Sequence, residues 1–576
     1  MLLDSCERWS SKPALWHKLR GKYSAVSYGQ LARRVHEAAA GLVTCGVKPG
    51  DRVAIMSENC PEWAYCDWAI LSLGAQTVPI YPTLMPEQVG HILQDSGAVV
   101  AVAGDARCAE KIRTACKERN LNVVEIVLHG DAAGALPLHR IVDEGKDTPL
   151  TFETWKEGCA LVDANDVATI IYTSGTTGEP KGAVLDHKAF TFLCEAILNN
   201  LPISQNDRFF SFLPLSHVYE RMAGHFLPIS CGAEIAYCES LRSMAADIVQ
   251  AQPTVILAVP RFLESVKTRI ESAAIEGSWL KRTLMNMQLS RGAERLKHRL
   301  RPVGAFGGTL DKLVGAKVRE RFGGKLRFFV SGGAALPPDI AEFYGAFGIL
   351  ILQGYGLTET APVISVNHPD RSVYQSVGEV IPGVEVQIAS DGEILMRGPS
   401  RMQGYYNRPD ETALVIDKDG WFHTGDLGRL DGNRLWITGR KKEIIVMANG
   451  KNVSPTELES RLKRSPWIDE VMVLGDDQDL ISALIVPNFE LVRSVCQSNH
   501  LSVSHQSEMV EYPVIVEKLK EEINKANAQL PDYEKIKRWT LLSESWTIES
   551  GEITPTLKLK RAFIKEKYAA VIQNLK

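Results

Sequence analysis

The sequence contains no apolar run that approaches the roughly 20 residues needed to span a bilayer. This lack excludes a membrane-spanning helix, so any membrane contact is expected to be peripheral. The first residues, MLLDSCERWSSKP, carry no basic flank followed by an apolar core. We therefore expect no signal peptide.

Paired cysteines are also lacking, because the eleven cysteines form no CxxC motif and are odd in number. This pattern argues against a disulfide framework or a zinc site and favours reduced thiols in a cytoplasmic protein.

No charge of one sign dominates: 65 Lys and Arg against 69 Asp and Glu give a net charge of −4. That balance argues against a nucleic-acid-binding protein.

A chain of 576 residues exceeds what one hydrophobic core normally serves, so two or more domains are expected. Helix-like and strand-like segments alternate along the first hundred residues, and Ser27 is placed to cap a helix. This alternation predicts α/β layers with a mostly parallel sheet. The predicted segments are a strand at Asp51–Met56, a helix at Trp63–Leu73, and strands at Gln76–Ile80 and Val99–Val102.

The segment IIYTSGTTGEPKGAV, Ile170–Val184, combines a buried strand with a loop of hydroxyls, glycines and a cation. Glycines let backbone N–H groups approach a ligand, so the loop fits a phosphate cradle. It lacks the GK[ST] ending of the Walker loop, and SGTTG alone would also fit a surface turn. The candidate residues are Thr173, Ser174, Gly175, Thr176, Thr177, Gly178 and Lys181.

Two later segments fit the remainder of a nucleotide. Leu326–Ala334 predicts a buried strand whose glycine-rich end would let a purine lie against backbone, at Gly332, Gly333 and Ala334. In QGYGLTET, Gln353–Thr360, the ring of Tyr355 would stack on adenine and the hydroxyl of Thr358 would bind the α-phosphate. The carboxylate of Glu359 suits Mg²⁺, which prefers oxygen ligands. Gln353, Gly354 and Gly356 complete this candidate site.

Together these segments closely resemble the signatures of the adenylate-forming (AMP-binding) superfamily, which includes acyl-CoA synthetases, luciferases and peptide-synthetase adenylation domains. The resemblance covers nearly the whole chain, including GWFHTGDL at Gly420–Leu427, GRKKE at Gly439–Glu443 and TPTLKLKR at Thr554–Arg561. It implies that the loop after Thr173 holds the triphosphate of ATP. It also implies that Thr173 and Glu359 hold Mg²⁺.

The resemblance assigns further roles. Asp426 would accept the ribose hydroxyls, Arg440 would lie near the ribose, and Lys442 would be the pivot of a hinge. Lys558 would be the catalytic lysine, with Lys560 as a rival two residues away. Leu557 stands where many relatives have glycine.

A strand from Arg208 is predicted to deliver His217, which from spacing alone would also fit a packed core histidine. In the family the matching histidine lies beside the acyl carboxylate. Arg221 stands where some relatives place a tryptophan that gates the acyl tunnel.

The resemblance implies an α/β fold with two domains. A large N-terminal domain, 1–441, would contain layered α/β subdomains and a β-rich subdomain. A smaller α+β C-terminal domain, 442–576, would carry the catalytic lysine and rotate about the hinge.

The expected activity is ATP-dependent conversion of a medium- to long-chain fatty acid into an acyl-adenylate. Transfer to the thiol of CoA would follow, with release of AMP and pyrophosphate. Alternatives are an acyl-[acyl carrier protein] synthetase and a non-catalytic nucleotide-binding homologue. A luciferase-like oxidase or an aryl-CoA ligase would share the phosphate motifs.

Basic residues are concentrated between Arg261 and Arg327, a segment predicted to be largely helical from Phe262 to about Arg321. It holds 16 Lys and Arg and 6 Asp and Glu, a difference of 16 − 6 = +10. A solvated helical face would explain this excess. The sharper interpretations are a surface for anionic membrane lipids or for an acidic carrier protein.

Overall fold

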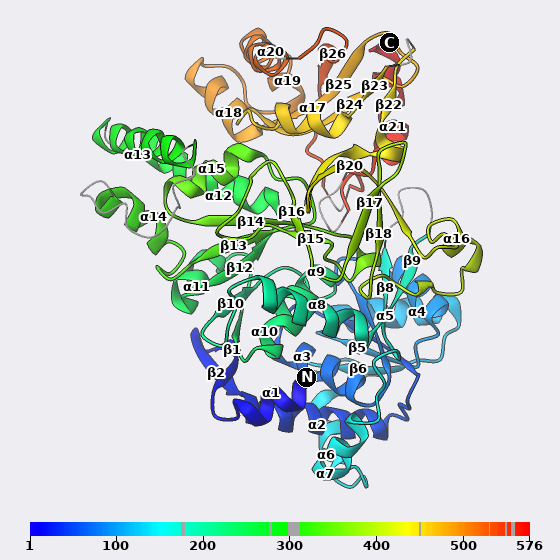
Figure 1. Cartoon of the computed structure of the whole chain (residues 1–576). Helices are drawn as coiled ribbons and strands as arrows, with labels where there is room; N and C mark the ends of the chain where they lie inside the picture. Colours follow the sequence, from blue (N-terminus) through cyan, green and yellow to red (C-terminus); the bar gives the residue numbers. More distant parts are fainter. Residues whose placement is uncertain are drawn as a thin grey trace.

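A computed structural model describes residues 1–173, 179–275, 279–297, 311–448, 451–528, 530–547, 550–554 and 559–575. Figure 1 shows a large N-terminal part with a smaller C-terminal part, coloured orange to red, above it. Both parts combine helices and sheets, so the α/β fold class predicted from the sequence is confirmed.

Thirteen strands among the described residues form the first sheet of the large domain. From β14 to β1 its neighbours are parallel, and the remaining pairs are antiparallel. Its order is β17 (Glu385–Ile388), β18 (Glu393–Arg397), β20 (Phe422–Asp431), β21 (Arg434–Arg440), β16 (Gly378–Val380), β15 (Ser365–Val366), β14 (Leu350–Tyr355), β13 (Phe328–Ser331), β12 (Val255–Ala258), β10 (Arg208–Ser211), β11 (Glu234–Tyr237), β1 (Pro13–Leu19) and β2 (Lys22–Ser27).

The second sheet has eight strands within the described part of the chain, and its pairs from β8 to β7 are parallel. Its order is β19 (Gly404–Tyr405), β9 (Lys181–Asp186), β8 (Val167–Thr173), β4 (Gln76–Ile80), β3 (Arg52–Met56), β5 (Val100–Ala103), β6 (Val124–Val127) and β7 (Leu136–Pro137). The strands predicted at Asp51–Met56, Gln76–Ile80 and Val99–Val102 correspond to β3, β4 and β5.

Helices lie between the two sheets and outside them. They are α1 (Leu2–Arg8), α2 (Tyr28–Thr44), α3 (Pro61–Ser72), α4 (Pro86–Ser96), α5 (Ala106–Arg119), α6 (Leu138–Gly145), α7 (Phe152–Cys159), α8 (His187–Asn200), α9 (Val218–Glu220), α10 (Leu227–Ser230), α11 (Met244–Ala251), α12 (Pro260–Ile275), α13 (Trp279–Lys297), α14 (Ala316–Glu320), α15 (Pro338–Ala346) and α16 (Pro409–Ala413). The π-helices η1 (Arg221–Phe226) and η2 (Asp311–Gly315) and the 3-10 turns η3 (Thr358–Thr360) and η4 (Lys441–Glu443) complete the set.

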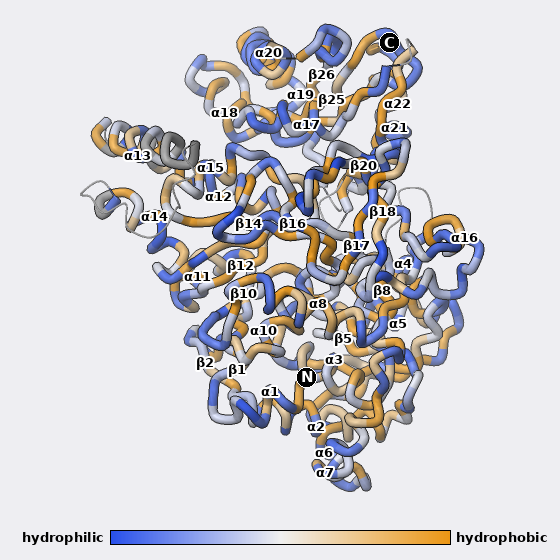
Figure 2. Tube along the Cα trace, viewed as in Figure 1, coloured by the Kyte–Doolittle hydropathy of each residue, from blue (hydrophilic) through white to orange (hydrophobic). Residues whose placement is uncertain are grey.

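The alternation of side chains along the strands builds these layers. Val53 and Ile55 of β3 face a core shared with the other sheet, whereas Ala54 and Met56 face the outer core. Successive residues of a strand point to opposite faces, so an apolar run is buried on both sides. Figure 2 shows the resulting hydrophobic strands, such as β10 and β12, in the interior.

Local signals explain where several helices begin. The Ser27 side chain accepts a hydrogen bond from the backbone N–H of Gln30, and the Gln30 side chain accepts one from the backbone N–H of Ser27. This capping box starts α2. Pro61 occupies the first turn of α3, where its missing N–H costs nothing.

The small domain has hydrophobic cores of its own, built from residues after Ile445. Its sheet joins β24 (Ile468–Leu474), β25 (Ile481–Pro487) and β26 (Ile536–Leu541), and β22 (Ile445–Val446) pairs with β23 (Asn452–Val453). Its helices are α17 (Pro455–Leu462), α18 (Phe489–Ser498), α19 (Gln506–Met509), α20 (Pro513–Asn527), α21 (Arg561–Lys567) and α22 (Ala569–Asn574).

The structure differs from the sequence prediction after β10. The strand expected to reach His217 ends at Ser211, because Pro214 cannot donate to a strand ladder and the chain turns away there. The β-rich region predicted after Gly378 is present, and its strands extend the first sheet in antiparallel fashion.

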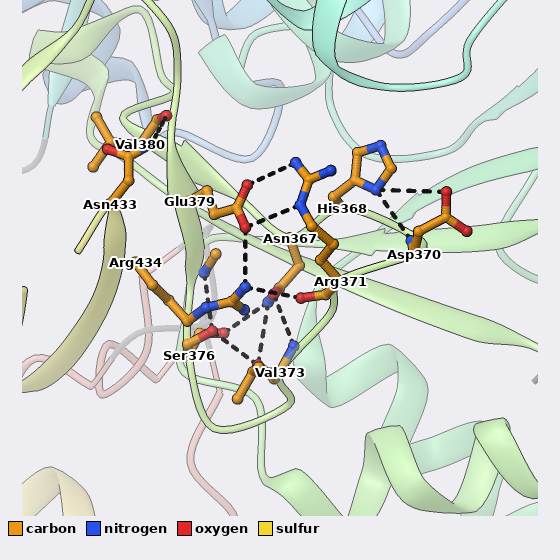
Figure 3. A network of polar contacts seen from close by, with 11 residues as sticks. Asn367, His368, Asp370, Arg371, Val373, Ser376, Glu379, Val380, Asn433 and Arg434 are labelled. Atoms are coloured by element: carbon orange, nitrogen blue, oxygen red, sulfur yellow. Dashed lines mark hydrogen bonds and ion pairs between the residues drawn. The ribbon is translucent and has the colours of Figure 1, made fainter. Parts of the chain in front are cut away.

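The connection between β15 and β16 is held by a polar network (Figure 3). The Asn367 side chain donates to the Ser376 carbonyl at 2.8 Å, and Arg371 and Arg434 both pair with Glu379. These contacts fix the end of β15, which begins at Ser365, shortly after the QGYGLTET segment ends at Thr360. In the described parts of the chain, no helix combines the length and apolar character needed to cross a membrane.

Candidate active site

A cavity of about 110 Å³ lies where β10, β13 and β14 end in the first sheet. The carboxyl ends of parallel strands are the usual place for ligands in such sheets. Seven of the residues selected from the sequence line this cavity: His217, Gly332, Gly333, Gly354, Tyr355, Gly356 and Thr358.

Much of the remaining lining is apolar. It comes from α8, the loop after it, and β10, β12 and α10, and includes Ile197, Leu201, Ile203, Phe209, Leu227 and Leu257. The cavity therefore combines backbone and hydroxyl groups with a large hydrocarbon surface.

His217 is oriented by the helix that follows it. Its Nδ1 accepts a hydrogen bond of 3.0 Å from the backbone N–H of Tyr219, as the N-cap of α9. Because Nδ1 accepts, a neutral His217 carries its proton on Nε2. The hydrogen-bond donor of the ring is then Nε2–H.

Asn59, which the sequence analysis did not select, holds the loop before His217. Its Nδ2 donates to the Leu213 carbonyl at 2.7 Å and to Ser211 Oγ at 3.0 Å, and its Oδ1 accepts from the Leu215 N–H at 2.9 Å. Asn59 follows β3 of the second sheet, so no local sequence signal reveals this contact.

Tyr355 of β14 comes together with Asp426 and Arg440, which lie on the later paired strands β20 and β21. Tyr355 Oη donates to Asp426 Oδ2 at 2.7 Å, and Arg440 Nε donates to Asp426 Oδ1 at 2.8 Å. Burial raises the pKa of Tyr355 well above its ordinary value, so its hydroxyl group remains protonated and donates the hydrogen bond. Burial opposes the charge of Arg440, but Asp426 raises its pKa above the ordinary value.

Glu359 is held by a tyrosine that the sequence analysis also missed. Tyr405 Oη donates to Glu359 Oε1 at 2.9 Å, and burial raises the pKa of Tyr405. Lys181 lies 5.4 Å from the centre of the Tyr405 ring and forms an ion pair with Glu411. Because β19 pairs with β9, Tyr405 connects the beginning of β9 to the carboxylate.

The remaining candidates lie around this centre. Thr173 ends β8, where its hydroxyl donates to the Lys181 carbonyl at 3.5 Å. Gln353 is buried within β14, whereas Ala334 and Lys442 are exposed. The candidates that lie outside the described residues are Lys558 and the loop of Ser174, Gly175, Thr176, Thr177 and Gly178.

Arg221 does not face the cavity but is fully buried behind it. Its guanidinium pairs with Asp67 through Nε at 2.9 Å and Nη2 at 2.6 Å, and Nη1 donates to Thr169 Oγ1 at 2.7 Å. Asp67 lies on α3 and Thr169 on β8, so the network ties the π-helix η1 to the second sheet. Ala223 of η1 lines the cavity, so this network fixes one of its walls.

The AMP-binding enzyme family matches residues 2–406, and the AMP-binding enzyme C-terminal domain matches residues 442–575. The long-chain-fatty-acid–CoA ligase FadD15 of Mycobacterium bovis is 34% identical over 96% of this chain and 92% of its own length. The peroxisomal long chain acyl-CoA synthetase 6 of Arabidopsis thaliana is 30% identical over 96% of this chain and 82% of its own length.

A solved structure supports the fold. The A domain of a carboxylic acid reductase from Segniliparus rugosus, in complex with AMP and a co-purified carboxylic acid, superposes with a TM-score of 0.79. It is 19% identical, and the match covers 100% of this chain and 93% of that one. From these matches over almost its full length, the chain belongs to the AMP-binding enzyme family.

Proposed function

We propose that this protein is a fatty acyl-CoA synthetase. It activates a medium- to long-chain fatty acid with ATP to form an acyl-adenylate, and then transfers the acyl group to the thiol of CoA. AMP and pyrophosphate are the other products.

The observation that carries this proposal is that polar and apolar residues line the same cavity. A fatty acid matches that combination, because each methylene removed from water contributes about 0.8 kcal/mol while the carboxylate needs polar partners. His217 and Thr358 are among the polar lining residues, and Leu201 and Phe209 are among the apolar ones.

In the first half-reaction, a carboxylate oxygen of the fatty acid attacks the α-phosphorus of ATP. A new oxygen–phosphorus bond forms, the bond to the bridging oxygen breaks, and pyrophosphate leaves. His217 donates a hydrogen bond from Nε2–H to orient the carboxylate, and Thr358 binds the α-phosphate. Tyr355 stacks on the adenine, and Asp426 accepts the ribose hydroxyls.

The donor set at the phosphate end fits Mg²⁺, since it consists of the Glu359 carboxylate and the Thr173 hydroxyl, and oxygen ligands suit this ion. When bound, the ion neutralises phosphate charge and orients the triphosphate. Tyr405 fixes the Glu359 carboxylate for this role through its hydrogen bond to Oε1.

In the second half-reaction, the thiol sulfur of CoA attacks the acyl carbonyl carbon and AMP leaves. The small domain, residues 442–576, turns about Lys442 between the two steps. This movement brings Lys558 to the site for adenylation and removes it for thiolysis.

ATP–pyrophosphate exchange that depends on added fatty acid tests the first half-reaction. Thioester formation, with acids from short to long chain, tests the second. A protein that binds ATP but supports no exchange with any acid would contradict the proposal and favour a non-catalytic homologue. ATP–pyrophosphate exchange followed by acyl transfer to acyl carrier protein but not to CoA would show that the carrier protein, and not CoA, is the acceptor.

Peripheral contact with an anionic membrane is part of the proposal, and α13 supports it. Its first residues, Trp279 and Leu280, are 72% and 50% exposed, and α13 projects from the large domain (Figure 1). Large apolar side chains beside basic ones are typical of segments that enter a lipid headgroup layer.

A further inference from the structure

Among the residues that the structure describes, two ionic contacts cross the interface between the large and small domains, and they share one arrangement. Glu470 belongs to β24 of the small domain, and Asp339 belongs to the first turn of α15 in the large domain. Figure 1 shows α17 at the edge of the small domain that faces α12 and α15. Each of the two acids binds one cation from its own domain and one from the other.

Glu470 is the more buried of the two acids, with a side chain only 5% exposed. Its Oε2 pairs with Lys463, which directly follows α17 in the same domain. Its Oε1 accepts a hydrogen bond of 2.8 Å from Nη1 of Arg261, which lies at the start of α12 in the large domain. The Arg261 side chain is 47% exposed, so water reaches this contact.

Asp339 shows the reverse arrangement. Its Oδ2 lies 3.7 Å from Nζ of Lys267, which belongs to α12 of the same domain. Its Oδ1 lies 3.8 Å from Nε of Arg464, which comes from the small domain. Arg464 and Lys463 are neighbours in the chain, so both contacts use the end of α17.

We infer that Arg261 and Arg464 are positioning residues that form a reversible latch between the domains and hold the small domain in the arrangement seen here. The effect of this latch on catalysis rests on the proposed function. Its effect on the domain arrangement does not.

The partner that each acid keeps in its own domain makes the latch reversible. A buried carboxylate left without a cation is strongly destabilising. When the domains separate, however, Glu470 retains Lys463 and Asp339 retains Lys267. The two arginines lose the acid that they bind here, and water solvates both readily because they are about half exposed. Opening therefore costs no more than two partly exposed ion pairs, which suits a movement that recurs in every catalytic cycle.

The test replaces both arginines by glutamine, as Arg261→Gln with Arg464→Gln. Electron spin resonance measures the distance between labels carried by non-canonical amino acids in α5 of the large domain and α20 of the small domain. We expect the population at the distance seen here to fall about threefold to tenfold relative to the alternative, the effect of losing two partly exposed pairs. Raising the salt concentration to about 0.5 M should weaken the wild-type latch in the same direction.

Two variants separate the latch from general destabilisation. Arg261→Lys retains the charge and should restore most of the wild-type distance distribution when combined with native Arg464. Arg269→Gln removes an exposed charge from the same helix, α12, and should change nothing. In the double variant, the ratio of adenylation to thiolysis rates should shift by the same factor as the population.

An unchanged distance distribution in the double variant overturns the latch, whatever the protein catalyses. A distance shift with an unchanged ratio of half-reaction rates overturns its role in catalysis. Absence of ATP–pyrophosphate exchange in the wild-type protein contradicts the proposed function instead, and the distance measurement still decides whether the latch exists.

Discussion

The buried carboxyl group of Glu220, close to His217, predicts how the stability of the protein depends on pH. Glu220 ends α9, one turn after His217, and its side chain is 1% exposed. Burial raises the pKa of Glu220 from 4.5 to about 8, and the neighbouring Ser211 hydroxyl only partly opposes this effect. The native protein therefore keeps this carboxyl protonated across a range of pH where the unfolded chain releases the proton.

The sign and size of the effect on stability follow from this difference. Between pH 4.5 and 8 the native state binds one proton more than the unfolded state, so the stability contributed by Glu220 falls as pH rises. The slope is about 1.36 kcal/mol per pH unit within that window. Between pH 5 and pH 7 the loss amounts to about 2.5 kcal/mol, since the proton is partly released near each end of the window.

Glu220→Gln keeps the shape of the side chain but cannot titrate. Unfolding by urea at pH 5, 6 and 7 would be followed by tryptophan fluorescence, because Trp63 and Trp68 pack against His225 of the adjoining η1 helix. We expect the free energy of unfolding of the variant, relative to wild type, to increase by about 2.5 kcal/mol from pH 5 to pH 7. Glu195→Gln, at an exposed position of α8, is the control.

A difference between variant and wild type that stays constant over this range would refute the reasoning. It would mean that Glu220 is ionised in the native protein and that its surroundings solvate the charge. A change of equal size in the Glu195 control would show that the effect is not specific to Glu220.

Three further predictions concern the proposed activity. Lys558→Ala should slow adenylate formation by about 10²–10³-fold, the usual effect of removing one donor that is positioned at the transition state, and leave thiolysis of supplied acyl-adenylate largely intact. A larger loss of adenylate formation in Lys560→Ala would assign the role to Lys560. Lys442→Pro fixes φ near roughly −65°, so acyl-adenylate should still form while thioester output falls, and unchanged output would place the pivot elsewhere. Charge reversal in the basic segment should abolish binding to anionic vesicles without affecting activity on a soluble short acid. Salt well below about 1 M should also release the wild-type protein from the vesicles. Vesicle binding that survives the reversal would contradict the membrane proposal. The residues reversed to Glu are Arg295, Lys297, Arg299 and Arg301.

The sequence predicted the parts of this structure that depend on neighbours in the chain. The cap at Ser27 and the strand Gln76–Ile80 require only local signals, and the structure has both. The Asn449-Gly450 pair, which lies outside the described residues, indicates a tight turn, and the strands on either side, β22 and β23, pair in antiparallel fashion.

The parts that were missed depend on contacts between distant segments. Arg221 and Asp67 are 154 residues apart, and Tyr405 and Glu359 are 46 residues apart. Neither pair has a spacing that predicts contact, because the strand order of the sheets decides which elements meet. For the same reason the sequence indicated the strands after Gly378 but not the sheet that they extend.

The carboxylate of Asp426 has a consequence for how a nucleotide enters. An ionised carboxylate offers about four lone-pair positions, and Tyr355 and Arg440 each use one, on different oxygens. Counting these two partners among the described residues, two positions remain, one on each oxygen, and the carboxylate is oriented by partners on separate strands. In the proposed function, the ribose diol therefore meets a carboxylate whose rotation is already restricted, so little side-chain entropy is lost when it binds.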